Sequence, residues 1–249
     1  MESHGSTLGD RSRSTLVAVC TYNERDNIDD LLQRIRRAVP QATILVIDDN
    51  SPDGTGQRAM EWADRDPQLR VVVRPGKLGL GTAIALAIEQ SISGKYLWLV
   101  NLDGDLSHDP ADIPRLLQAA QPQTGRAPDV VIGSRYIPGG QIVGWPWTRR
   151  TISKALNTAA RGLLRLNVYD ASGAFRCYRV AALERLDRDT LRARGYALLE
   201  ELLWHLQRQG CHFVEIPITF TERTRGNSKL SWREAWGALQ MLVQLSLRR

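Results

Sequence analysis

The chain has 249 residues, which is enough for one large domain or two small ones. Its hydrophobic fraction of 43% and charged fraction of 24% are those of an ordinary globular protein, and no stretch reaches the roughly 20 apolar residues of a membrane-spanning helix. The net charge of +6 favours an anionic partner: a nucleotide, a phosphorylated substrate, a nucleic acid or an acidic membrane surface. The three cysteines suit neither a disulfide framework nor a zinc site, which favours a reducing compartment.

The chain begins with a polar segment, residues 1–14, that has no apolar centre. We predict that it is a disordered tail and not a signal peptide, because a signal peptide needs an apolar segment. Residues 15–249 are predicted to form a single domain.

Apolar segments typical of strands alternate with amphipathic segments typical of helices through the first half of the chain. The predicted strands cover residues 16–20, 43–47, 69–73, 96–100 and 129–133. Each of the first four is followed by a predicted helix, and Asn23 is the predicted N-cap of the first helix. Strands that alternate with helices in this way imply an α/β fold with a mostly parallel sheet.

Three of these strands end in polar residues. Those residues are Tyr22 and Glu24, Asp48 and Asp49, and Asp103 and Asp105. In an open parallel sheet the ligand site lies outside the carboxyl ends of the strands. We therefore expect the three groups to lie in one cleft.

The most informative of these endings is the segment Leu97–Ser107, read LWLVNLDGDLS. Two carboxylates so close together, at the end of a buried strand, repel one another and resist desolvation. A divalent cation such as Mg²⁺ or Mn²⁺ removes that conflict, because both ions prefer oxygen ligands. Gly104, between the two aspartates, allows the backbone to approach closely. The alternative is an ordinary Asp-Gly turn, and the pair alone favours a metal site only slightly.

The second half of the chain is less regular. It contains, in order, a loop rich in glycine and tryptophan (137–147), a basic amphipathic segment (149–166), a polar segment (170–176), a helix from 195 to 209, a strand (213–220), a polar loop (222–229) and a closing helix with Trp232 and Trp236. The basic segment 149–166 and the closing helix are both amphipathic, which is typical of shallow contact with a membrane surface. Their apolar residues fit the core of the domain or a subunit interface equally well, so both interpretations stay open.

Six motifs occur in the order in which they occur in a known family. They are Thr21–Glu24, Asp48–Thr55, Gly79–Gly81, Asp103–Asp105, Gly133–Tyr136 and Arg223 with Ser228–Leu230. On these motifs the chain resembles an inverting GT-A glycosyltransferase, and within that group a polyprenol (dolichol) phosphate mannosyltransferase. The resemblance covers residues 15–245. It implies a GT-A (Rossmann-like) fold: a mostly parallel sheet flanked by helices, with C-terminal amphipathic helices.

The resemblance also implies roles for individual residues. It places the nucleotide-sugar donor against Cys20, Tyr22, Glu24, Ile47, Asp49, Asp103, Gly104, Asp105, Arg135, Arg194, Arg223 and Lys229. It places Mg²⁺ or Mn²⁺ on Asp103 and Asp105, and it gives catalytic roles to Asp105, Arg135, Arg223 and Lys229, the last three as ligands of phosphate.

The chain departs from the family pattern at several positions. Many relatives have proline where this chain has Cys20, and some have glutamine as a third metal ligand where Ser107 stands, so we expect water in that place. The roles of Glu201 and of the segment 170–176 stay open, and an exposed helix position is the alternative for Glu201.

The resemblance implies that the protein transfers mannose from GDP-mannose to a polyprenyl (dolichyl) phosphate with inversion. The implied partners are these two substrates and a membrane surface, with a small membrane-anchoring subunit as a further candidate, and the implied location is the cytoplasmic face of a membrane. Transfer of glucose from UDP-glucose to the same lipid, and a non-catalytic nucleotide-binding module at a membrane, are the alternatives. Nucleic acid is not expected, because a carboxylate-lined cleft repels phosphate unless a metal is bound.

Overall fold

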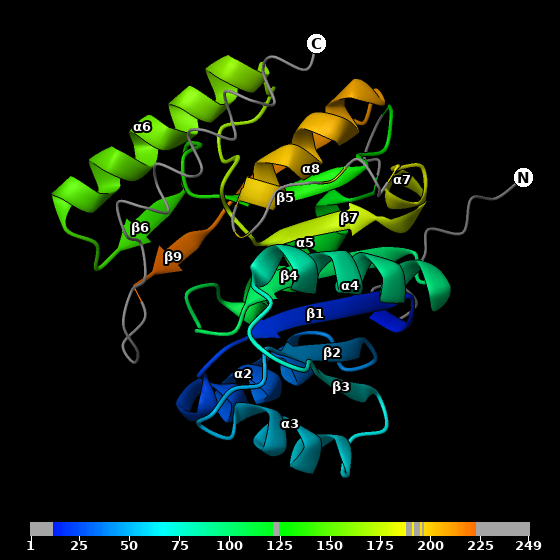
Figure 1. Cartoon of the computed structure of the whole chain (residues 1–249). Coiled ribbons are helices and arrows are strands. Elements are labelled where there is room, and N and C mark those ends of the chain that lie inside the picture. Colours follow the sequence, from blue (N-terminus) through cyan, green and yellow to red (C-terminus); the bar gives the residue numbers. More distant parts are fainter. Residues whose placement is uncertain (1–11, 122–124, 188–190, 192–194, 196, 223–249) are drawn as a thin grey trace, which may run out of the picture.

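In the computed structural model, a seven-stranded sheet forms the centre of the fold and helices cover both of its faces (Figure 1). The structure describes residues 12–121, 125–187, 191, 195 and 197–222. The strands are β1 (Thr15–Thr21), β2 (Thr43–Asp48), β3 (Leu69–Val73), β4 (Trp98–Asp103), β5 (Val130–Ser134), β6 (Gln141–Val143), β7 (Arg176–Arg179), β8 (Phe213–Pro217) and β9 (Thr219–Thr221). The helices are α2 (Arg25–Ala38), α3 (Thr55–Ala63), α4 (Leu80–Ser93), the 3₁₀ turn η1 (Pro110–Asp112), α5 (Ile113–Ala119), α6 (Trp147–Leu164), α7 (Val180–Glu184) and α8 (Ala197–Arg208).

The strand order of the large sheet is β3-β2-β1-β4-β7-β5-β8. Strands β1 to β4 are parallel, β5 and β8 are parallel to each other, and β7 runs antiparallel between β4 and β5. The mostly parallel sheet flanked by helices is therefore confirmed. The sequence does not predict β7, because a four-residue strand read Arg-Cys-Tyr-Arg has too little apolar periodicity.

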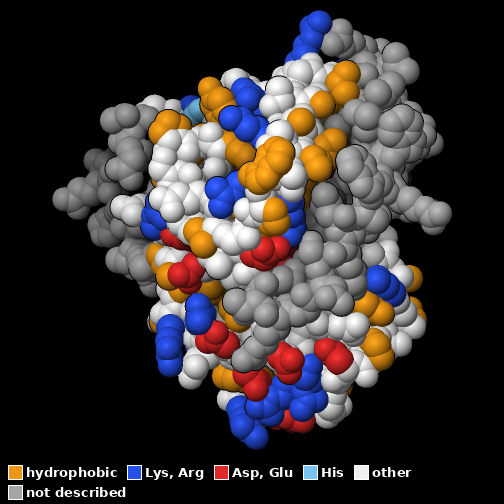
Figure 2. Space-filling model, turned by 90° about the vertical axis from the view of Figure 1, so that its left-hand side faces the viewer, with side chains coloured by type: hydrophobic (Ala, Val, Ile, Leu, Met, Phe, Trp, Pro, Cys, Tyr) orange, Lys and Arg blue, Asp and Glu red, His pale blue; other side chains and the backbone are white. Residues whose placement is uncertain are grey.

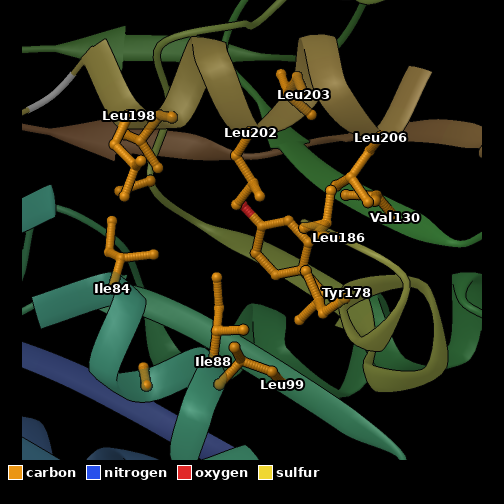
Figure 3. Packing of buried hydrophobic residues seen from close by; sticks show 14 of the residues in the cluster. Ile84, Ile88, Leu99, Val130, Tyr178, Leu186, Leu198, Leu202, Leu203 and Leu206 are labelled. Atoms are coloured by element: carbon orange, nitrogen blue, oxygen red, sulfur yellow. The ribbon is translucent and has the colours of Figure 1, made fainter. Parts of the chain in front are cut away.

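Each face of the sheet has its own core, because successive residues of a strand point to opposite faces. On β1, Leu16 and Ala18 belong to the core formed with α4 and α8, whereas Val17 and Val19 belong to the core formed with α2 and α5. In the first of these cores, side chains of α4 and α8 surround the ring of Tyr178 on β7 (Figure 3). Both faces are thus covered, and the strand ends remain as the place for a ligand.

The predicted strand over 213–220 is in fact two strands that belong to different sheets. β8 pairs with β5 in the large sheet, whereas β9 pairs with β6 in a separate two-stranded sheet. Pro217 ends β8, because proline has no N–H with which to continue the ladder. Ile218 makes the transition: its N–H donates to Ser134 O at 3.1 Å, and its carbonyl accepts from the first residue of β6 at 2.9 Å. The predicted loop 137–147 accordingly contains a strand, β6.

The N-terminus of α2 is held by the loop that follows β2. The predicted N-cap, Asn23, is wrong, because Glu24 occupies the cap position and Asn23 has a φ of 61°. The N–H of Asn23 donates to Ser51 Oγ at 3.0 Å, and that of Glu24 donates to Thr55 Oγ1 at 2.9 Å. Side chains of the Asp48–Thr55 motif thus replace a local cap.

The predicted disordered tail is wrong for its last three residues. Gln41 donates its N–H to Ser12 Oγ at 3.0 Å, and Arg13 Nε donates to Gln41 Oε1 at 2.8 Å. The N–H of Leu97 donates to Ser14 O at 2.9 Å, so this stretch is tied to the sheet. The rest of the tail, residues 1–11, and the predicted closing helix with its two tryptophans lie outside the described residues.

The basic amphipathic segment forms a helix, α6, as the sequence predicts. Its buried residues are Asn157, Ala160 and Leu164, whose spacing places them on one side of the helix. Lys154 and Thr158 are exposed, and Trp147 at the start of the helix is 77% exposed. Among the helices of the described ranges, none combines the length and the apolar character that crossing a membrane requires.

Helix α8 carries two buried carboxyl groups near its start, Glu200 and Glu201. The exposed position that the sequence allows for Glu201 is therefore wrong. Beside them, the buried Arg176 donates from Nη1 to the carbonyl oxygen of Leu199 at 2.8 Å. Burial raises the pKa of Glu200 to about 7 from an ordinary value of 4.5. The folded protein therefore keeps a proton on Glu200 that the unfolded chain releases between these two pH values.

We expect Glu200→Gln to stabilise the protein at alkaline pH. Because the folded-state pKa lies above the unfolded-state value, the wild type loses stability as pH rises from 4.5 to about 7, and a neutral glutamine avoids this loss. The gain in the free energy of unfolding is about 3 kcal/mol at pH 8 and much smaller at pH 5. Urea unfolding at both pH values measures it, with the exposed Glu89→Gln on α4 as the control. An equal change at both pH values would contradict the argument.

Candidate active site

The carboxyl ends of β2, β1 and β4 lie side by side, because these three strands are adjacent and parallel. Cys20 pairs in register with Ile47 on one side and with Asp103 on the other. The N–H of Asp49 donates to Thr21 O at 3.1 Å. The three polar strand endings therefore meet at one edge of the sheet, as the sequence predicts.

A close contact joins the ends of β1 and β4 at Gly104. A Cβ atom on this residue would lie 2.9 Å from Thr21 Cγ2 and 3.1 Å from the carbonyl oxygen of Cys20. It would also lie 3.4 Å from Glu24 Cγ. A close-packed interior has no room for an added carbon at such separations, so the position requires glycine and the predicted close approach is confirmed.

Asp103 and Asp105 are half-buried at the end of β4. Asp105 Oδ1 accepts from the N–H and from Oγ of Ser107, at 3.0 and 2.5 Å, so this carboxylate is oriented by its own turn. Within the described ranges, no group of three or more His, Cys, Asp or Glu side chains is arranged for a metal ion. The metal site predicted on Asp103 and Asp105 stays a prediction, and two carboxylates suit an ion of the Mg²⁺ type that also binds phosphate.

His108 packs beside this pair and is buried. Its Nδ1 lies 3.9 Å from Asp103 Oδ2, and its ring centroid lies 5.2 Å from those of Phe175 and Phe220. Burial lowers the pKa of His108 to about 4, so the imidazole is neutral at pH 7. A neutral imidazole adds no positive charge beside the two carboxylates. Sequence reasoning missed this residue, because a single histidine after the aspartate pair carries no pattern.

Asp49 fixes the loop that leads into α4. Its carboxylate forms a buried ion pair with Arg74 and accepts from the N–H of Gly79 at 2.8 Å. Arg74 also donates to Gly79 O at 3.0 Å and to Thr82 Oγ1 at 2.5 Å. Gly79 has a φ of 89°, which favours glycine, and it opens α4 as the sequence predicts. The nucleotide contact predicted for Asp49 stays a prediction.

The same loop brings a lysine to the predicted nucleotide site. Lys77 Nζ lies 4.1 Å from the centroid of the Tyr22 ring, in the position of a cation–π contact. Sequence reasoning missed Lys77, because a single exposed lysine in a loop carries no pattern.

Arg135 follows β5 and is held by Asp170, which lies in the segment whose role the sequence leaves open. Nε and Nη2 of Arg135 donate to the two carboxylate oxygens of Asp170, both at 2.7 Å, and the N–H of Arg135 donates to Oδ2 at 3.0 Å. Asp170 is fully buried and Arg135 is 8% exposed. Burial alone would raise the pKa of Asp170, but the Arg135 guanidinium reverses that effect and lowers it. Both groups are therefore charged at neutral pH.

Strand β9 brings the chain back to the aspartate motif. The N–H of Thr221 donates to Ser107 O at 3.0 Å, and the N–H of Glu222 donates to Val143 O at 2.8 Å. Glu222 Oε1 also accepts from Arg149 Nη1 at 2.7 Å. The chain is thus anchored beside the Asp103–Asp105 turn at the last residue that the structure describes.

The predicted site residues fall into three groups. Those brought to one edge of the sheet are Cys20, Tyr22, Glu24, Ile47, Asp49, Asp103, Gly104 and Asp105. Arg135 follows β5, which runs in the same direction as β4 with β7 between them, and its charge interacts with that of Asp103. Arg194, Arg223 and Lys229 lie outside the described residues, so the phosphate contacts assigned to them stay predictions.

Sequence comparison finds close relatives along most of the chain. It is 40% identical over 238 residues to a polyprenol monophosphomannose synthase of Mycolicibacterium smegmatis, covering 95% of this chain and 88% of the relative. It is 41% identical to an undecaprenyl-phosphate mannosyltransferase of Micrococcus luteus, with 87% of each chain covered. A dolichol-phosphate mannosyltransferase of Pyrococcus furiosus is 32% identical over 92% of this chain and 62% of that protein.

Among solved structures, glucosyl-3-phosphoglycerate synthase of Mycobacterium tuberculosis, in complex with Mn²⁺, UDP and glucosyl-3-phosphoglycerate, has a TM-score of 0.66. The identity is 20%, and the match covers 99% of this chain and 85% of that one, so it shows that the GT-A fold is shared. The family model for glycosyl transferase family 2 matches residues 16–187, from β1 to the end of the segment that follows α7. With the family model matched over most of the chain and with these relatives, the chain belongs to glycosyl transferase family 2 and is a glycosyltransferase.

Proposed function

We propose that this glycosyltransferase transfers mannose from GDP-mannose to a polyprenyl phosphate, with inversion at the anomeric carbon. The observation that carries the proposal is the anchoring of β9 on Ser107, which brings Thr221 beside the aspartate motif; in the sequence, Arg223, Arg225 and Lys229 follow shortly after. A site that binds an anionic donor and an anionic acceptor together needs positive charge near the phosphates of both. The names of the mannosyltransferases of M. smegmatis and M. luteus support the choice of sugar and of lipid acceptor.

The donor is assigned to the edge formed by β2, β1 and β4. Asp103 and Asp105 would hold Mg²⁺ or Mn²⁺, and such an ion, when bound, neutralises charge on the diphosphate leaving group. Cys20, Tyr22 and Ile47 are assigned to the nucleoside, together with the carboxylates Glu24 and Asp49, which can accept hydrogen bonds from the base or ribose.

The acceptor phosphate is assigned to Arg135, Arg223 and Lys229. Arginine binds a phosphate through a planar fork of N–H groups, and lysine adds a point charge. A phosphate monoester has a second pKa of about 6, so it is already largely a dianion at pH 7 and needs no strong general base. One of its oxygens attacks the anomeric carbon as the bond to GDP breaks, and this single displacement inverts the configuration.

A membrane surface is the natural place for this reaction, because each methylene taken out of the bilayer costs about 0.8 kcal/mol. Figure 2 shows hydrophobic side chains next to Lys and Arg over the face on which α6 lies. Exposed there are Trp147 and Tyr169, with the Arg161 guanidinium 4.2 Å from the ring centroid of Tyr169. We assign this face to the headgroup region at the cytoplasmic side of the membrane, where the three free cysteines would stay reduced.

The reaction is tested with labelled sugar donors. We expect the purified protein, with polyprenyl phosphate and Mg²⁺ or Mn²⁺, to transfer label from GDP-mannose into organic solvent. The same incubation with labelled UDP-glucose is expected to give no product. Label from UDP-glucose alone would replace the proposed donor, and label from neither would overturn the proposed reaction.

We expect Asp105→Asn to weaken metal-dependent binding of GDP while the fold stays intact. The change removes one of the two carboxylate charges but keeps the shape that bonds to Ser107. Calorimetry with GDP and Mn²⁺ is expected to show at least about tenfold weaker binding, since even changes outside the ligand shell cost that much. Asp109→Asn, exposed on the same loop, is the matched control. Unchanged binding by Asp105→Asn would remove the metal from this site.

We expect the protein to co-sediment with anionic liposomes, and the bound fraction to fall as salt rises. Each Lys or Arg near an anionic surface contributes about 1 kcal/mol, and salt screens this attraction. Trp147→Ala is expected to reduce binding without lowering the melting temperature, because the side chain is 77% exposed. Leu97→Ala, which changes a 61% exposed residue just before β4, is the control. Wild-type protein left in the supernatant at low salt would instead require a membrane-anchoring subunit.

A further inference from the structure

The loop over residues 169–173 is held by side chains from three elements. Glu215 on β8 accepts from the first two N–H groups of the loop, at 2.6 and 2.9 Å. Asn157 on α6 accepts from the next two N–H groups, at 2.9 and 3.2 Å, and donates to Ser172 Oγ at 3.1 Å. Arg176 on β7 donates to the carbonyl oxygen of residue 171 at 2.6 Å. The backbone of this loop is therefore fixed from outside the loop itself.

The side chain of Asp170 is fixed as firmly as the backbone. The N–H of Gly173 donates to Asp170 Oδ1 at 3.0 Å. A Cβ atom on Gly173 would lie 3.1 Å from the same oxygen, so the turn closes tightly around the carboxylate. Because Asp170 is fully buried, a single arrangement of its two oxygens is presented to Arg135.

The Arg135 guanidinium uses only part of its hydrogen-bonding capacity on this loop. Nε donates to Asp170, and Nη2 donates to Asp170 at 2.7 Å and to Ser172 Oγ at 3.0 Å. These bonds account for three of the five N–H groups of a guanidinium and leave the two on Nη1. Arg135 Nη1 makes no hydrogen bond to any residue in the ranges that the structure describes.

We propose that Asp170 is a positioning residue that fixes the Arg135 guanidinium with Nη1 presented to the acceptor phosphate. The inference rests on the proposed function, in which Arg135 binds that phosphate. Because Asp170 compensates the charge of Arg135, the pair carries little net charge. It binds the phosphate mainly through the directed hydrogen bonds of the guanidinium.

The first test needs no substrate. The Arg135 Nε–H group is buried and donates to Asp170, so its ¹⁵N–¹H resonance is expected to exchange slowly with water; loss of the signal in Arg135→Lys assigns it. In Asp170→Asn we expect this exchange to be at least about tenfold faster, because a charge-assisted hydrogen bond is lost. Asp129→Asn is the matched control. Asp129 is also buried and pairs with arginines, but it lies just before β5, at the opposite end of that strand from Arg135. Unchanged exchange in Asp170→Asn would overturn the proposal.

The second test measures turnover in two backgrounds. Asp170→Asn is expected to lower kcat with polyprenyl phosphate by about 10- to 100-fold, the cost of a misplaced group, while GDP binding stays unchanged. In an Arg135→Ala background the same change is expected to have no further effect on kcat, since Asp170 acts through Arg135. A further loss in that background would mean that Asp170 is merely structural, and would overturn the proposal. A wild-type protein that transfers no mannose would count against the proposed function, while the exchange measurement still decides whether Asp170 fixes Arg135.

Discussion

The parallel ladder of β2, β1 and β4 is the constraint on which the rest of the site depends. Parallel neighbours must end at the same edge, so residues from three distant parts of the sequence meet there, and side-chain contacts such as that of Thr21 Oγ1 with Asp48 Oδ1 at 2.9 Å then join the strand ends. Gly104 tightens this meeting, since only the absence of a side chain lets the end of β4 lie against the end of β1. The ladder holds Asp103 in place, and the turn closed by Ser107 orients Asp105 beside it.

The features that follow simple periodicities could be predicted from the sequence. The four parallel strands of the first half and the helices between them are long enough for their apolar patterns to stand out, and α6 shows its amphipathic pattern clearly. The convergence of Tyr22, Asp49 and Asp103 follows from topology alone once those strands are assigned. The close approach at Gly104 also follows, because a glycine between two charged residues at a strand end indicates that another part of the backbone lies against it.

The remaining features depend on partners that are distant in the sequence. β7 is short and gains its place from neighbours on both sides, and the division between β8 and β9 becomes clear only when β6 is seen to receive the second strand. The N-terminus of α2 takes its caps from a different loop, so a local rule that favours Asn23 fails there. Asp170 has an ordinary turn sequence around it, and its importance lies in an ion pair across 35 positions of the chain.

The anchoring of β9 has a consequence for how this enzyme can diversify. Thr221 and Glu222 are attached to Ser107 and Val143 through backbone N–H and carbonyl groups, which every residue except proline provides in full. Replacement of these side chains therefore leaves those attachments in place. The chain beyond residue 222 can change its sequence while its starting point beside the aspartates is inherited unaltered. Under the proposed function, in which Arg223 and Lys229 bind the acceptor phosphate, the contacts with the acceptor can thus vary without a change in the strand ends assigned to the sugar nucleotide.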